Sequence, residues 1–233
     1  MPVHTYTNWN VRSSDMEEQV EPYRKYFFIC EGANTETFYF KRLIDLRKQL
    51  GINPLIDIRL WEKTDGDKNL SFPKNLVKFA GNQKKLESDF DYERDKMVIV
   101  FDGDIFEEKV QGYDDLIAEI EGSGDIAAVT NPGFELFLIL HVEKSIEQYI
   151  QGNEKKFVCT DEKGSYSYAY NLLREITGMN AKKNPEIGKM ADNVLVAIEQ
   201  EKRINQNIYD IKGKVTSNVG SVIEMIIKEK PDI

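Results

Sequence analysis

Two short segments that are apolar at every position, YFFIC at 26–30 and MVIVF at 97–101, most constrain the fold of this chain. A strand that is buried on one face alternates apolar and polar residues, whereas a strand covered on both faces is apolar throughout. Both segments therefore predict strands inside a sheet with helices on each side. Two further segments, at 55–61 and 125–130, also have the pattern of strands.

Helical patterns separate and follow these strands. Apolar residues recur at helical spacing in four segments, at about 34–51, 72–90, 113–122 and 131–142. In the last of these, Asn131 is a good N-cap and Pro132 suits the first helical position. The order from 26 to 142 is then β-α-β-α-β-α-β-α, which predicts an α/β fold with a mostly parallel sheet covered by helices.

The rest of the chain divides into a polar start and a helical end. Residues 1–24 are polar and irregular, so we expect an N-terminal arm, followed by an α/β domain at 25–150. Residues 151–233 predict a helical extension packed on that domain. Its expected helices lie at 165–177, 185–206 and 215–229.

The charge of the chain limits how it could contact nucleic acid. The formal net charge is −9, from 31 basic and 40 acidic residues, which argues against a protein that coats nucleic acid with a basic surface. A nuclease is not excluded, because an acidic site can recruit Mg²⁺. We interpret the lysines at 155–156, 182–183, 212 and 214 as solvated loops, with phosphate contact as the alternative.

Several classes of protein are excluded by missing motifs. The sequence has no phosphate-binding P-loop, no GxGxxG fingerprint, no GxSxG elbow and no HExxH. Cys30 and Cys159 do not have the spacing of a zinc or redox motif, and Cys30 is expected in the core. The polar N-terminus and the shortness of the apolar runs lead us to expect a cytoplasmic protein without a membrane partner.

Acidic residues follow two of the predicted strands directly. Glu31 follows the first strand, and Asp102 and Asp104 follow the third as the sequence DGD. The carboxyl ends of parallel strands meet at one edge of a sheet, where ligands bind. Clustered carboxylates repel unless a cation lies among them, and Mg²⁺ prefers oxygen ligands. We therefore predict a Mg²⁺ or Mn²⁺ site at this edge. The alternative is an ordinary DGD turn, because Asp and Gly favour turns.

Two more acids are candidates for the same site. Glu36, in the first turn of the helix after Glu31, is either a further metal ligand or a residue that complements the helix dipole. Glu135 lies within the almost wholly apolar FELFLIL, and a buried carboxylate needs a partner or a metal. We predict a catalytic role for Glu135 beside Glu31. The alternative is a structural pair with a lysine or a helix end. His141 is expected to be a core or helix-end histidine.

These segments together resemble known proteins. FFICEGANTETFYF and MVIVFDGD are similar to the two metal-binding motifs of the TOPRIM domain of topoisomerases, primases and OLD-type nucleases. NPGFELFLILH at 131–141 resembles the RloB-like family, which is related to the AbiL abortive-infection component. SNVGSVIEMII at 217–227 is similar to the closing segment of that family, although Val219 stands where the family usually has Pro. The resemblance extends over about 22–229.

The resemblance implies a TOPRIM-like fold and a magnesium-dependent nuclease. Such a protein would be a toxic effector in antiviral defence by abortive infection, with an ABC-type ATPase as partner and tRNA, other RNA or DNA as substrate. Matched by motif, Glu31 is the catalytic acid and Asp102 and Asp104 are the metal-binding pair. Glu36 matches the Thr-Glu of the first motif, whereas the role of Glu135 is our inference.

Two other functions remain open from the sequence. One is a non-enzymatic regulatory subunit whose acidic surface binds a partner ATPase. The other is a HAD-like phosphatase with Asp102 as nucleophile, although such enzymes carry DxD on the first strand and here it ends the third. The sequence also leaves open whether the chain forms a homodimer.

Overall fold

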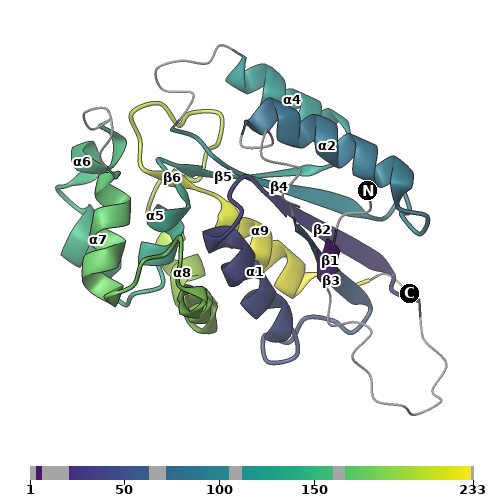
Figure 1. Ribbon diagram of the computed structural model, residues 1–233, viewed down its shortest axis with the longest axis horizontal. Helices are drawn as coiled ribbons and strands as arrows, with labels where there is room; N and C mark the ends of the chain where they lie inside the picture. The colour runs from purple at the N-terminus through teal and green to yellow at the C-terminus, as the bar shows by residue number, and fades with distance from the viewer. Residues whose placement is uncertain (1–3, 7–20, 63–71, 105–111, 160–165, 232–233) are drawn as a thin grey trace.

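The computed structural model describes residues 4–6, 21–62, 72–104, 112–159 and 166–231. Its centre is a six-stranded sheet with the order β1-β3-β2-β4-β5-β6 (Figure 1). The four inner strands are parallel to one another: β3 (Ile56–Glu62), β2 (Arg24–Cys30), β4 (Lys96–Asp102) and β5 (Ile126–Asn131). The two edge strands are antiparallel to their neighbours: β1 (His4–Tyr6) and β6 (Thr216–Ser217). The predicted α/β class with a mostly parallel sheet is confirmed.

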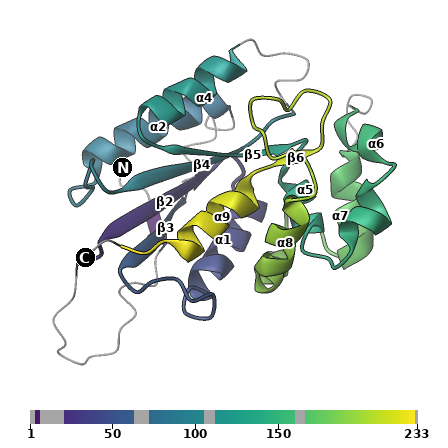
Figure 2. The same cartoon turned by 180° about the vertical axis from the view of Figure 1, so that it is seen from behind.

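Helices cover both faces of this sheet (Figures 1 and 2). One face carries α2 (Pro73–Leu86) and α4 (Tyr113–Gly122), and the other carries α1 (Thr35–Asp45) and α9 (Val219–Lys228). Along β2, Phe27 and Ile29 pack on the side of α2, whereas Phe28 and Cys30 pack on the side of α1. Both faces of β2 are thus buried, which explains why its sequence is continuously apolar.

The remaining helices lie on the side of the sheet where β5 ends (Figure 1). They are α5 (Phe134–Ile139), the π-helix Ile146–Ile150, α6 (Glu154–Val158), α7 (Tyr168–Thr177), the 3-10 helix Pro185–Asn193 and α8 (Val194–Glu201). In the part of the chain that the structure describes, no helix is long and apolar enough to cross a membrane.

Three parts of the predicted organisation need correction. Residues 4–6 do not belong to an irregular arm, because they form β1 opposite β3. The expected helix at 185–206 is a 3-10 helix followed by α8, which ends at Glu201. The segment after 150 adds β6 to the edge of the sheet and α9 to one of its faces, so it does more than extend the domain with helices.

The 3-10 helix packs closely against α1. A Cβ added at Gly188 would lie 2.4 Å from the carbonyl oxygen of Phe38 on α1. The backbone of the 3-10 helix therefore lies directly against α1, at a distance that only glycine allows. This contact fixes the segment before α8 to the helix that begins at Thr35.

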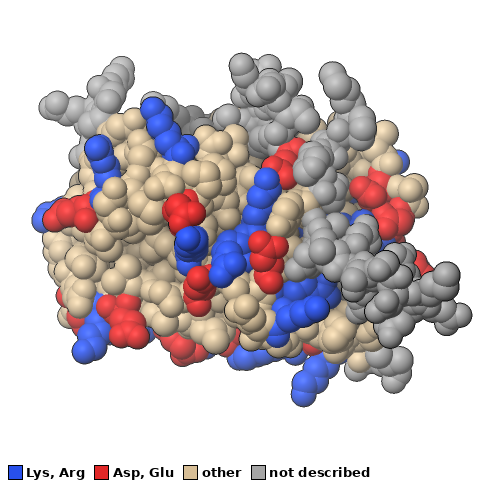
Figure 3. Space-filling model, turned by 60° about the horizontal axis from the view of Figure 1, so that its bottom comes forward, with Lys and Arg blue, Asp and Glu red and all other residues tan. Residues whose placement is uncertain are grey.

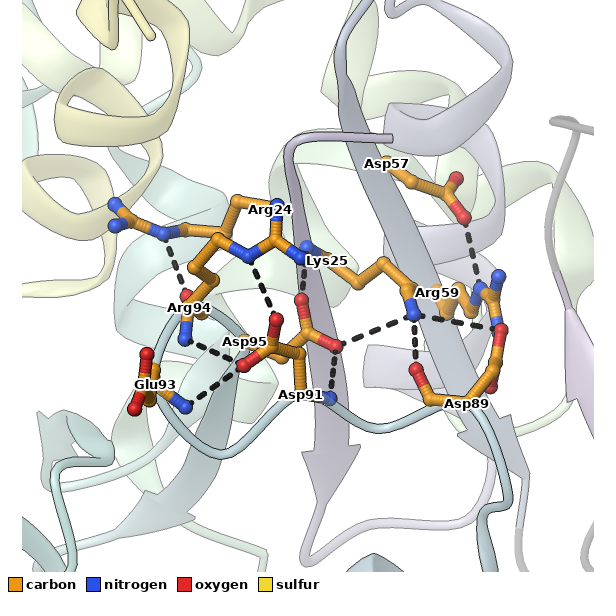
Figure 4. Close-up of polar contacts among 9 residues, drawn as sticks. All are labelled: Arg24, Lys25, Asp57, Arg59, Asp89, Asp91, Glu93, Arg94 and Asp95. Carbon is orange, nitrogen blue, oxygen red and sulfur yellow. Dashed lines mark hydrogen bonds and ion pairs between the residues drawn. The ribbon is translucent and has the colours of Figure 1, made fainter. Parts of the chain in front are cut away.

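At the amino ends of β2, β3 and β4, buried charges face opposite charges (Figure 4). The Lys25 side chain is 4% exposed, and its Nζ lies 3.3 Å from Asp95 and 3.4 Å from Asp89. Asp57 has no exposed surface and accepts a 2.8 Å hydrogen bond from Arg59 Nε. Removing one partner from such a pair leaves a buried charge uncompensated. The charges at this edge therefore hold the strands to the loop before β4.

His141 is a core residue, as predicted. Its ring is packed against Tyr39 and Phe137 and is 2% exposed. Nδ1 lies 2.9 Å from the Phe137 carbonyl oxygen, and Nε2 lies 2.9 Å from the Tyr39 hydroxyl. The carbonyl can only accept, so Nδ1 donates to it and the neutral ring accepts from Tyr39 through Nε2. Burial lowers the pKa of His141 from 6.5 to about 4, because a charged ring would lose its hydration.

We expect His141 to make the fold sensitive to acid. Its folded-state pKa lies below the unfolded value, so its full contribution to stability is present above pH 6.5 and is lost as the pH falls toward 4. Between pH 7.5 and pH 5 this loss is about 2 kcal/mol. The His141→Gln variant does not titrate there. The difference in unfolding free energy between wild type and variant should therefore shrink by that amount at pH 5 in urea titrations. An unchanged difference would show that the ring is not held neutral.

Candidate metal and catalytic site

The carboxyl ends of β2 and β4 bring Glu31 and Asp102 together. The strands pair in parallel with Cys30 opposite Val100, so the residues that follow them emerge side by side. The backbone N–H of Glu31 donates to the Val100 carbonyl at 2.8 Å. Its side-chain Oε2 in turn accepts a 3.1 Å hydrogen bond from the backbone N–H of Asp102. The predicted meeting of these two strand ends is therefore present.

The Asp102 carboxylate is oriented by β5 and the turn after it. Thr130 lies opposite Asp102 in the β4–β5 pairing, and its hydroxyl donates to Asp102 Oδ1 at 3.1 Å. The backbone N–H of Phe134 donates to the same oxygen at 3.0 Å. Two donors on one oxygen fix the plane of the carboxylate. The sequence motifs did not single out Thr130, although its place at the end of a predicted strand was a usable signal.

Gly133 brings Glu135 next to Asp102. A Cβ added at Gly133 would lie 3.2 Å from Asp102 Oδ2 and 3.2 Å from Glu135 Oε2. The two carboxylate oxygens are therefore no farther apart than twice that distance. A side chain at position 133 would occupy the space on which they converge. Glu135 thus faces the strand-end acids, as predicted, while the rest of its helix is buried.

The local structure before Glu135 differs from the predicted one. Asn131 does not cap the helix: it is the last residue of β5, its bond to Pro132 is cis, and α5 begins only at Phe134. The Asn131 amide instead donates to the carbonyl oxygens of Ile211 and Lys214, at 2.9 and 3.0 Å. The prediction failed because a contact far along the chain uses the side chain that local capping rules assigned to the helix.

Glu36 folds back over the turn after β2. Its Oε1 accepts a 3.2 Å hydrogen bond from the backbone N–H of Gly32. A Cβ added at Gly32 would lie 2.0 Å from Glu36 Oε2, so the glycine of the Glu-Gly pair makes room for this carboxylate. Glu36 is 7% exposed, in the first turn of α1, which begins at Thr35 as predicted. Its carboxylate therefore binds a backbone N–H of the turn before α1 and lies close enough to Asp102 for its charge to raise the pKa of that residue.

Asp104 lies at the exposed rim of this site. It follows Gly103, whose backbone N–H donates to the Thr130 carbonyl at 2.6 Å, and its own N–H donates to the Pro132 carbonyl at 3.3 Å. The DGD segment therefore continues along the end of β5. We refer to the five acids at this edge as the acidic cluster: Glu31, Glu36, Asp102, Asp104 and Glu135.

Asp102 is the electrostatic centre of the acidic cluster. Burial raises the pKa of Asp102 well above its ordinary value, and the charges of the four other acids raise it further, Glu36 most strongly. Carboxylates that are all ionised at such a place repel one another, and a divalent cation among them removes the repulsion. The opposite edge of the sheet balances its buried acids with arginine and lysine (Figure 4).

The pKa of Glu135 is affected by burial and by both a negative and a positive neighbour. Burial raises the pKa of Glu135 and the charge of Asp104 raises it further, whereas the positive charge of Lys182 lowers it. The sequence did not predict that Lys182 lies near Glu135. The Asn34 amide donates to the Lys182 carbonyl at 3.0 Å, and the Thr35 hydroxyl donates to the Ala181 carbonyl at 3.2 Å. These contacts bridge almost 150 positions, so no local pattern could have shown them.

The donor set suits Mg²⁺ or Mn²⁺, because every candidate ligand is a carboxylate oxygen. Among the described residues, no three Asp, Glu, His or Cys side chains converge tightly enough to enclose an ion by themselves. Mg²⁺ does not require this, since it commonly binds one or two carboxylates and keeps several waters. Asp102 with Glu31 or Glu135 meets that requirement. Asp102 also retains some accessible surface.

The chain matches a known protein family. A family model described as RloB-like protein matches residues 26–228. No curated protein and no solved structure matches the chain. The matched segment spans most of the sequence and includes every member of the acidic cluster. The chain therefore belongs to the RloB-like family.

Proposed function

We propose that this protein is a Mg²⁺- or Mn²⁺-dependent nuclease that hydrolyses phosphodiester bonds at the acidic cluster. The observation that carries the proposal is the position of Asp102. Its backbone N–H binds Glu31, its carboxylate converges with that of Glu135 on the space at Gly133, and burial and four other acids raise its pKa. Hydrolysis of a phosphodiester needs positive charge at the phosphate and a base for the attacking water. A cation-loaded acidic cluster offers both.

The members of the acidic cluster would have two roles, metal binding and proton transfer. Asp102 and Asp104 would hold the metal ion, with Glu31 and Glu36 as further ligands. A metal ion bound there would stabilise negative charge on the phosphate and leaving oxygens. Glu31 or Glu135 would accept the proton of the attacking water at a carboxylate oxygen. Burial raises the pKa of Glu135, which would make it a stronger base for this step than an ordinary glutamate.

The family supports a wider proposal about role and partners. Resemblance to RloB-like proteins suggests an effector of anti-phage defence that works with an ABC-type ATPase and cleaves tRNA, other RNA or DNA. The net charge of −9 leaves little general attraction for nucleic acid. On the face drawn in Figure 3, basic and acidic side chains are interleaved. The substrate would then be held by local contacts, by the metal ion and by the partner.

Cleavage of total tRNA and of plasmid DNA by the purified chain tests this proposal. The chain would be assayed alone and with its ATPase, with Mg²⁺ or Mn²⁺. We expect metal-dependent cleavage of one substrate and a loss of about 10²–10⁴-fold in Glu31→Ala, as is typical for a missing general base. Glu93→Ala, at an exposed position before β4, is the matched control and should cleave normally.

Other outcomes would replace the proposal. Full activity in Glu31→Ala would show that the acidic cluster does not carry the reaction. Binding of the ATPase without cleavage under any metal condition would favour the regulatory subunit, which the net charge of −9 also suits. A phosphorylated aspartate at position 102 would instead identify a HAD-like phosphatase. The location of Asp102 on β4, after β2 and β3 in the chain, argues against that alternative.

A further inference from the structure

Two tyrosines stack at the start of α7. The ring centroids of Tyr166 and Tyr170 are 4.3 Å apart and their planes differ by 20°. Tyr170 is 3% exposed and belongs to the core, whereas Tyr166 is 53% exposed. The turn between them is fixed, because the Ser167 hydroxyl accepts a 3.2 Å hydrogen bond from the backbone N–H of Tyr170. A buried ring thus supports an exposed ring that presents apolar surface to solvent.

Lys182 adds a positive charge to this pair. Its Nζ lies 5.7 Å from the ring centroid of Tyr166 and 5.5 Å from that of Tyr170. A lysine at this distance is attracted by the ring electrons and is held near them. Its backbone is also fixed, through the hydrogen bond from Asn34. We refer to Tyr166, Tyr170 and Lys182 as the tyrosine–lysine platform.

The tyrosine–lysine platform borders the acidic cluster. The hydrogen bonds from Asn34 and Thr35 attach residues 181–182 to the start of α1, immediately before Glu36. Helix α7 packs against α5, which carries Glu135. The charge of Lys182 is also close enough to act on Glu135. The platform is therefore attached to α1 and α5, the helices that carry Glu36 and Glu135, and we expect a strand bound at the acidic cluster to reach it.

We propose that the tyrosine–lysine platform binds one nucleotide of a single-stranded nucleic acid, with the base stacked on Tyr166 and a phosphate near Lys182. An aromatic side chain accepts any base, because every base has a π-face, and an adjacent cation contacts the backbone. In a duplex both faces of each base are already stacked, so the platform selects unpaired strands. The inference rests on the proposed function, in that the bound strand is the substrate of the acidic cluster.

Binding of a fluorescein-labelled, single-stranded RNA of about 12 nucleotides tests this site by anisotropy. The same sequence as DNA and as a duplex would be compared, with Ca²⁺ in place of Mg²⁺ to limit hydrolysis. We expect Tyr166→Ala to weaken binding of single strands by about 5- to 150-fold. Tyr166→Phe should retain affinity. Duplex binding should not depend on Tyr166.

The matched control is Tyr92→Ala. Tyr92 is 65% exposed and its ring lies 5.2 Å from that of Phe90, in the loop before β4 and so at the opposite end of that strand from Asp102. This variant should bind like wild type. Lys182→Ala should lower the slope of log affinity against log salt by about 0.7, the value for one phosphate contact on a single strand. Tyr166→Ala should leave that slope unchanged.

Two results would overturn the inference: single-strand binding that is absent, or binding that is equal in wild type and Tyr166→Ala. If these occur while metal-dependent cleavage persists, the proposed nuclease stands and only the platform falls. If single strands bind through Tyr166 but cleavage is absent with every metal, the platform stands as a binding site and the nuclease proposal fails. The two failures are therefore separable.

Discussion

Replacing Asp102 by Asn is expected to abolish metal-dependent cleavage, by about 10³-fold or more, and to stabilise the metal-free protein. The amide keeps an oxygen that can accept from Thr130 and Phe134. It removes the charge that burial and four nearby acids disfavour. Each 1 kcal/mol gained would raise the melting temperature by about 2–4 °C in a chain of this size. Loss of activity together with a gain in stability is typical of a residue kept for function.

Stabilisation by Mn²⁺ distinguishes the loss of a metal ligand in Asp102→Asn from a general disturbance of the fold. Wild-type protein should gain about 2.7 kcal/mol at a free Mn²⁺ concentration 100 times the dissociation constant, whereas Asp102→Asn should gain little. Asp91→Asn is the control, because Asp91 pairs with Arg94 in the loop before β4. It should keep both the cleavage and the response to Mn²⁺. A normal Mn²⁺ response in Asp102→Asn would contradict the proposed ligand role.

Replacing Glu201 by Ala is expected to have the largest effect on stability. Glu201 has no exposed surface and ends α8. Its Oε1 accepts from the Ser217 hydroxyl at 2.6 Å and from the Gly220 N–H at 2.8 Å, and its Oε2 accepts from the Ser221 N–H at 2.7 Å. One carboxylate thus fixes β6 and the start of α9.

The expected cost follows from the donors that would be left behind. Glu201→Ala removes the acceptor of the Ser217 hydroxyl and of the Gly220 and Ser221 N–H groups in the interior, and should lower the unfolding free energy by about 3–5 kcal/mol. The corresponding fall in melting temperature is about 6–20 °C, measured by calorimetry. Glu199→Ala is the matched control on the same helix. Glu199 is 70% exposed and pairs with Lys202 at the surface, so its loss should change stability by about 0.5 kcal/mol or less. Equal effects of the two variants would refute the capping role.

The strand-end part of the site could be predicted because it depends on local pattern. A continuously apolar run needs cover on both faces, and parallel strands end at a common edge, so Glu31 and Asp102 had to come close. Glu135 was recognised because a carboxylate in an apolar helix needs a reason to be there. These inferences used only neighbours in sequence and the geometry of sheets.

What could not be predicted depends on contacts between distant segments. The Asn131 amide is used by residues about 80 positions away, which overrides its capping preference. No local pattern singled out Glu201, because the donors that bind its carboxylate lie in β6 and at the start of α9. Lys182 looked like a solvated loop lysine, and only its folded position places it beside the rings of Tyr166 and Tyr170.

Titration of the wild-type protein with Mn²⁺, followed by the electron paramagnetic resonance signal of the free ion, tests the central claim most directly. We predict saturable binding of about one or two ions, the number found in phosphodiester-cleaving metal sites. Mg²⁺ should displace the bound Mn²⁺, and Asp102→Asn should lose this binding. Absence of saturable binding, or the same binding in Asp102→Asn, would contradict a metal centre at the acidic cluster.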